Sequence, residues 1–205
     1  MKRNYFLAVE GIKSILLVAL ALGLFTFFGF YFLALLASFF LAFLLFIFRN
    51  LERIPQNREK NAILAPCDGI LESVINDGNK IILKFKINIL NCGILRNPIF
   101  VDSINIKQKH GFFIKSNSSL KDILNTKAKI EGFLNDKLVY KMTILPELIN
   151  IFEIYYVKSP FIGDRVGFMK YGYLLLELDN NVDIFVEKGD SVLSGESMLG
   201  KFHED

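Results

Sequence analysis

The feature that most constrains this chain is an apolar run near its N-terminus. From Ser14 to Phe48 the sequence has 35 consecutive residues without an acidic or basic side chain. About 20 apolar residues suffice for one membrane-spanning helix, so the run predicts a membrane protein. A cleaved signal peptide would have a shorter apolar core and a cleavage site of small residues, whereas this run ends in Phe46-Ile47-Phe48-Arg49. We therefore expect the segment to be retained.

The length of the run favours two short spans over one. As a single helix it would measure about 50 Å at about 1.5 Å per residue, which exceeds a hydrocarbon core about 30 Å thick. Gly29 lies near the midpoint and offers a turn. The prediction is a transmembrane helical hairpin over 14–48, with a re-entrant hairpin or one steeply tilted span as alternatives.

Charged residues on both sides of the run predict its orientation. The basic residues that flank it are Lys2, Arg3, Lys13, Arg49, Arg53, Arg58 and Lys60. Because basic residues stay on the cytoplasmic side, both ends and the domain that follows are expected there, at the cell (inner) membrane. This basic collar also attracts anionic headgroups, so membrane phospholipid is the expected partner, and nucleic acid is not.

Composition divides the chain into four ranges. They are a basic N-terminus (1–13), the membrane hairpin (14–48), a polar linker (49–61) and one domain (62–205). Short segments rich in β-branched and aromatic residues fill the domain, separated by turn signals such as Asn76-Asp77-Gly78-Asn79. Gly163-Asp164 and Gly189-Asp190 each precede a strand-like segment and are interpreted as β-turns. The pattern predicts a mainly β domain of sandwich or barrel type.

Four motifs carry a resemblance to a known family. They are Phe48-Arg49-Asn50-Leu51-Glu52-Arg53-Ile54-Pro55, Ala65-Pro66-Cys67-Asp68-Gly69, Arg96-Asn97-Pro98-Ile99 and the segment from Gly163 to Gly172. In this order and spacing they resemble the short prokaryotic type of phosphatidylserine decarboxylase, whose members process themselves and have an N-terminal apolar hairpin. The resemblance covers nearly the whole chain and implies a phosphatidylserine-decarboxylase-like domain over 62–205. The family's Asn-Glu-Arg-Asn signature has its nearest counterpart at Asn125-Thr126-Lys127-Ala128.

The resemblance implies a lyase that makes its own cofactor. In the family, a serine hydroxyl attacks the carbonyl of the preceding glycine, and β-elimination then leaves a pyruvoyl group that serves as an electron sink in decarboxylation. Here the residue after Gly172 is Tyr173. A tyrosine has no hydroxyl on Cβ, so it can neither undergo the acyl shift nor eliminate. The pyruvoyl group is predicted to be absent, and no other cofactor or metal is expected.

The other positions of the family's self-cleavage site are only partly filled. Counted back from Arg96-Asn97-Pro98, the family's histidine falls on Gly93, so the general base is predicted to be lost. The family's aspartate corresponds to Asp68, which is interpreted first as a turn residue and second as a remnant of catalysis. Arg96 is a candidate for pairing with a lipid phosphate, and a solvated loop arginine is the alternative.

These residues predict a phosphatidylserine-decarboxylase-related membrane protein of phosphatidylethanolamine metabolism that is a non-catalytic homologue, or pseudoenzyme. One alternative is an active decarboxylase with another processing site, for which Ser159 and Ser194 are the candidates. A second is a membrane-anchored scaffold or adaptor that binds a protein partner. A third is a lipoyl-like carrier domain, because the segments around Asp68 and Gly189 resemble hammerhead half-motifs and Lys170 stands near the place of a modified lysine.

Overall fold

We describe the protein from a computed structural model, which describes residues 6–54, 59, 61–114, 124–148, 151–157 and 160–203. Ser159 lies outside these ranges. The chain divides into two compact units, Met1–Glu52 and Arg53–Asp205. The division falls inside the range that the sequence predicts as a linker, and each unit is described by itself.

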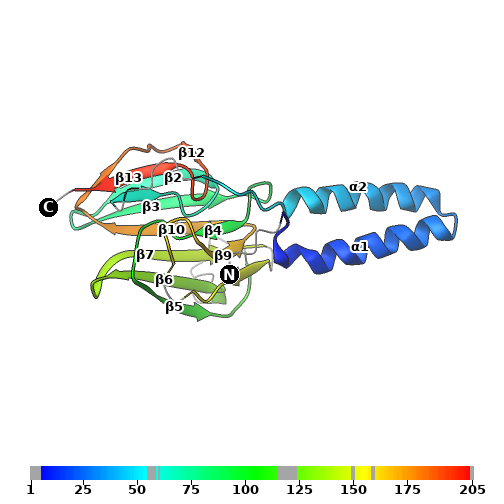
Figure 1. The fold of residues 1–205 in the computed structure, drawn as a ribbon, viewed down its shortest axis with the longest axis horizontal. Coiled ribbons are helices and arrows are strands. Elements are labelled where there is room, and N and C mark those ends of the chain that lie inside the picture. Colours follow the sequence, from blue (N-terminus) through cyan, green and yellow to red (C-terminus); the bar gives the residue numbers. More distant parts are fainter. Residues whose placement is uncertain are drawn as a thin grey trace. The chain divides into compact units, whose positions relative to one another are not determined.

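The first unit contains two antiparallel helices, α1 (Val9–Phe27) and α2 (Tyr31–Ile47), seen in Figure 1. Gly29 makes the turn between them with a φ of +78°, a conformation that favours glycine. At the open end, the backbone N–H of Ala8 donates to the carbonyl of Phe48 over 2.8 Å. These contacts hold the two ends of the helix pair together.

Most side chains of α1 and α2 are exposed although nearly all are apolar. By length and composition α1 could cross a membrane, whereas α2 has 17 residues and is shorter than a typical span. α1 begins at Val9, before the predicted start at Ser14, because a first helical turn tolerates charge and its dipole favours Glu10. The unit therefore indicates an apolar membrane anchor.

The second unit is mainly β, as the sequence predicts. Its strands form a seven-stranded antiparallel sheet in the order β12-β2-β3-β10-β7-β6-β5 and two three-stranded sheets, β1-β13-β11 and β4-β9-β8. Figure 1 shows the strands of the large sheet side by side. The strands are β1 (Ala62–Leu64), β2 (Gly69–Asn76), β3 (Lys80–Ile87), β4 (Ile94–Arg96), β5 (Ser103–Lys109), β6 (Lys127–Leu134), β7 (Lys137–Pro146), β8 (Phe152–Ile154), β9 (Arg165–Met169), β10 (Gly172–Asp179), β11 (Val182–Ile184), β12 (Ser191–Val192) and β13 (Met198–Phe202).

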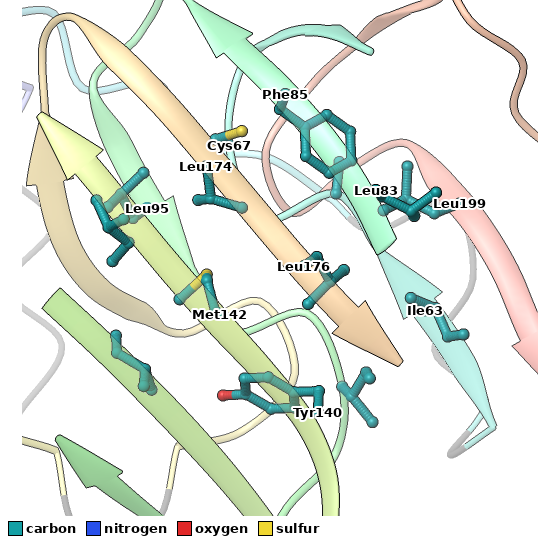
Figure 2. Close-up of a cluster of buried hydrophobic side chains, with 14 of the residues drawn as sticks. Ile63, Cys67, Leu83, Phe85, Leu95, Tyr140, Met142, Leu174, Leu176 and Leu199 are labelled. Atoms are coloured by element: carbon teal, nitrogen blue, oxygen red, sulfur yellow. The ribbon is translucent and has the colours of Figure 1, made fainter. Parts of the chain in front are cut away.

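The core lies on one face of the seven-stranded sheet. Along β3 and β10 every second residue is buried, as expected of strands with one face against a core. Figure 2 shows Phe85 and Leu174 of this face with Ile63, Leu95 and Leu199, which the small sheets contribute to the same cluster. The two small sheets thus cover the inner face of the large one.

Glycine and aspartate make the turns that the sequence indicates. Gly78 has a φ of +73° in the turn between β2 and β3. In the two Gly-Asp segments, Oδ2 of Asp164 accepts the N–H of Phe161 over 2.9 Å, and Oδ2 of Asp190 accepts that of Glu187 over 2.8 Å. Both segments are aspartate-capped turns of the same local design.

Strand register places many connections at one edge of the large sheet. Gly172, the first residue of β10, is paired with Ile87 at the end of β3 and with Pro146 at the end of β7. Lys127, the first residue of β6, is paired with Lys109 at the end of β5. We call this end of the sheet, where β3, β5 and β7 end and β6 and β10 begin, the Gly172 edge. It is defined by strand ends and not by an outermost strand.

Candidate functional site

Asp68 lies between β1 and β2 and is buried. Its Oδ1 accepts a hydrogen bond from Nη1 of Arg53 and another from the backbone N–H of Ser194 at 2.8 Å. Its Oδ2 accepts from Nη2 of Arg53 at 2.7 Å and from the backbone N–H of Cys92 at 3.2 Å. The carboxylate therefore ties together three segments that are distant in sequence, and four donors surround it.

Arg53 forms a two-pronged ion pair with Asp68, and the side chains of both are more than nine-tenths buried. Burial acts to lower the pKa of the guanidinium, but the hydrogen bond and charge of Asp68 outweigh it and raise the pKa above its ordinary value. The side chain also contacts the carbonyl of Ser194 at 3.3 Å and the carboxylate of Glu196 at 3.8 Å. In the sequence, Arg53 belongs to the flanking basic residues and to the first family motif, but neither pattern identifies it as the partner of Asp68.

Gly93 occupies the position predicted for the lost histidine, and the structure leaves no room there for a side chain. A Cβ on Gly93 would lie 2.7 Å from the ring of Phe168 and 3.0 Å from the carbonyl oxygen of Met169. Phe168 is fully buried, so its ring has little freedom to move. The backbone is also tied down, because the N–H of Met169 donates to the carbonyl of Gly93 over 2.8 Å.

Gly172 and Tyr173, at the predicted cleavage position, begin strand β10. Gly172 has a φ of +142°, and a Cβ there would lie 2.2 Å from the carbonyl oxygen of Leu145, so the backbone requires glycine. Tyr173 pairs with Lys86 and Leu145 in the sheet. The ammonium of Lys84 lies 4.5 Å from the centre of its ring, which is a cation–π contact.

A series of contacts joins the predicted positions. Asp68 accepts the N–H of Cys92, the next residue Gly93 bonds to Met169, and Lys170 donates from Nζ to the carbonyl of Asn91. The chain then reaches Gly172 two residues later. The structure therefore brings the 91–93 connection against both Asp68 and the segment that leads into β10.

Lys170, the candidate carrier lysine, is fully buried. A lysine that carries lipoate or biotin must be accessible to the modifying enzyme. Its burial, and its bond to Asn91 within the domain, favour a structural role for this side chain.

Arg96 lies at the end of β4, directly opposite Arg165 of β9. Its Nη1 donates to the carbonyl of Gly163 over 2.8 Å, and its stem packs on Gly195, where an added Cβ would lie 2.4 Å from Cδ. Burial lowers the pKa of Arg96, and the charge of Arg165 adds to the effect. Two half-buried cations are thus held close together, an arrangement that an anion would stabilise.

Asn97 and Cys67 complete the surroundings. The Asn97 side chain is buried, donates to the carbonyl of Ile99 at 2.7 Å and accepts the hydroxyl of Tyr140 at 2.6 Å. Cys67 is a buried free cysteine, and burial, with the charge of Asp68, raises the pKa of its thiol well above the ordinary value. A thiol of this kind is a poor nucleophile near neutral pH.

Comparison with known proteins finds sequence similarity to an enzyme. It is 26% identical over 216 residues to a phosphatidylserine decarboxylase proenzyme from Geotalea uraniireducens (strain Rf4), with 95% of this chain and 92% of that protein covered. No family model and no solved structure matches the chain. The similarity supports the relationship to the phosphatidylserine decarboxylase family that the four motifs predict.

Proposed function

We propose that this chain is a membrane-anchored, non-catalytic relative of phosphatidylserine decarboxylase that binds phospholipid headgroups at the cytoplasmic face of the membrane. The similarity to the decarboxylase proenzyme supports a role in phospholipid metabolism. The apolar helix α1 supports membrane anchorage, and the basic residues on both sides of the apolar run support the cytoplasmic side.

The observation that carries the proposal is the pair Gly172-Tyr173. The residues present do not fit a pyruvoyl group, because the tyrosine at the cleavage position has no hydroxyl on Cβ. The sequence contains no Gly-Ser dipeptide, so the family's cleavage pair is absent from it. Ser194, considered as a substitute, follows Leu193 and is buried with its hydroxyl on the carbonyl of Pro66 at 3.2 Å.

Phospholipid binding is assigned to Arg96 and Arg165. Their cross-strand pairing holds two cations together, and a phosphate could accept hydrogen bonds from both guanidinium groups. The charge of Asp68 also acts on Arg96, but both oxygens of Asp68 already accept hydrogen bonds from Arg53. A diester phosphate is the chemical group common to phosphatidylserine and phosphatidylethanolamine, so this pair does not by itself select between them.

The proposal is tested with purified full-length protein in mixed micelles that contain labelled phosphatidylserine. We expect one intact species near 23.4 kDa, no loss of the carboxyl label, and saturable lipid binding that weakens in Arg96→Gln and Arg165→Gln. Lys137→Gln, a change at the far end of the sheet from the Gly172 edge, is the matched control.

Each other outcome points to a different reading. Two fragments together with label loss would establish an active decarboxylase with an unrecognised processing site. An intact chain without lipid binding would leave a scaffold or adaptor for a protein partner. A mass increase from a covalently attached group would establish the carrier alternative, which the burial of Lys170 disfavours.

A further inference from the structure

Four large apolar side chains are exposed together at the Gly172 edge. Phe112 is 63% exposed, Leu148 53%, Leu124 41% and Ile114 40%. They lie in the connection between β5 and β6 and in the one after β7, which the strand register places at this edge. We call these four residues the apolar platform.

Buried polar side chains hold the platform in place. Asn125 donates from Nδ2 to the carbonyl of Ile114 at 2.7 Å and accepts the N–H of the same residue at 3.0 Å. Thr126 bonds in the same reciprocal way to the N–H and carbonyl of Gly111, each at 3.0 Å. Because Asn125 and Thr126 are buried, their hydrogen bonds fix the backbone that carries the exposed apolar side chains.

Backbone bonds join the parts of the platform. The N–H of Phe112 donates to the carbonyl of Leu124 at 2.9 Å, and the N–H of Leu148 donates to the carbonyl of Phe113 at 2.7 Å. Leu148 has a φ of +59°, which is uncommon for a residue other than glycine, asparagine or aspartate. The two connections are thus joined by backbone hydrogen bonds, with their apolar side chains exposed.

Four lysines stand beside the platform on one face of the sheet. Lys109 is paired with Lys127, and Lys107 with Lys129, at the end of β5 and the start of β6. Alternate residues of a strand share a face, so all four lie on the same side. Like charges directly opposite each other disfavour the folded state, and Glu131 at 3.5 Å from Lys107 offsets only part of this charge.

We propose that the apolar platform and the four lysines together rest on an anionic phospholipid surface. Apolar side chains that enter the headgroup region beside lysines that meet anionic lipid are the two components of interfacial membrane binding. The occupant is a bilayer because the same chain carries an apolar helix that could hold the domain near one. The inference rests on the proposed membrane anchorage and is independent of headgroup binding at Arg96.

The absence of tryptophan from the sequence makes a direct test available. Full-length Phe112→Trp and Leu124→Trp are reconstituted in vesicles of phosphatidylglycerol and phosphatidylcholine that are brominated high on the acyl chain. Phe39→Trp in α2 reports anchorage. Leu138→Trp is the matched control, because Leu138 lies at the start of β7, far from the Gly172 edge, and is as exposed as Leu124.

We expect bromolipid to quench the emission of both platform tryptophans and the one at position 39, and to leave that at position 138 unchanged. Lys109→Gln with Lys127→Gln in the Phe112→Trp background should reduce the quenching, as should vesicles of phosphatidylcholine alone. Quenching at position 39 without quenching at 112 and 124 would overturn the inference and leave the anchor intact. Equal quenching at 112 and 138 would also overturn it, and no quenching at 39 would refute the anchorage on which it rests.

Discussion

Asp68 and Tyr173 stand at two positions of one predicted site, and their surroundings differ in kind. Asp68 is buried and engaged by four donors from three distant segments. Tyr173 is half-buried, belongs to a regular strand and has its ring under Lys84. Under the proposal that the chain is non-catalytic, the comparison separates a site residue kept for its structural role from one replaced by a residue that suits its strand.

The largest expected effect comes from the Asp68 side of the comparison. Arg53→Ala leaves a buried carboxylate without its cation, so we expect a loss of about 3 to 5 kcal/mol in the free energy of unfolding. The measurement is chemical denaturation of the full chain in micelles, followed by circular dichroism. Lys201→Ala is the control, because it removes a partly exposed ion pair with Glu59 and should cost about 1 kcal/mol at most. Equal losses in the two variants would mean that the Arg53–Asp68 pair stabilises the fold no more than an exposed ion pair does.

The next effect tests whether the position predicted for the family's histidine has room for a side chain. Gly93→His forces a side chain against the buried ring of Phe168, and such overpacking costs about 1 to 3 kcal/mol. Leu90→His places the same residue on an exposed site three positions away and should change stability by about 0.5 kcal/mol or less. The same unfolding measurement applies. A Gly93→His variant as stable as the parent would show that the position still accepts a base.

The third prediction concerns how stability depends on pH through Cys67, the residue next to Asp68 in the sequence. An unfolded thiol ionises at about pH 8.5, and burial raises the folded-state pKa above that value. The stabilisation is therefore complete below about pH 8.5 and is lost as pH rises toward the folded-state pKa. One unit above 8.5 the loss approaches about 1.4 kcal/mol. Urea midpoints across this range should fall more steeply for the parent than for Cys67→Ala, and parallel profiles would contradict the assignment.

The smallest effect belongs to Tyr173. Tyr173→Ser removes the cation–π contact with Lys84, which is worth about 0.5 to 1 kcal/mol at a partly exposed site. We expect its intact mass to remain that of one uncut chain, since Gly93 supplies no general base. Tyr173→Phe keeps the ring and should match the parent in stability. Cleavage of the serine variant at Gly172 would reveal a latent self-processing site. It would show that the surroundings of position 173 still support the chemistry, against the contrast drawn with Asp68.

Local chemistry made much of the fold predictable. Short segments rich in β-branched and aromatic residues indicate the strands, and Asn76-Asp77-Gly78-Asn79 indicates the turn between β2 and β3. The family resemblance also led to Asp68. It did not reveal Arg53 as its partner, nor the bond between Asn97 and Tyr140, since hydrophobic periodicity carries no information on which polar side chains meet across the domain.

Sequence alone determined what depends on covalent structure. An apolar run of this length predicts membrane association, and a tyrosine after Gly172 has no hydroxyl with which to form a pyruvoyl group, whatever the fold around it. Only the tertiary structure decided that Asp68 is engaged from 15, 24 and 126 residues away and that Phe168 fills the space beside Gly93. The physical reason is that burial, hydrogen-bond partners and free space arise where distant segments pack, whereas bond chemistry belongs to each residue by itself.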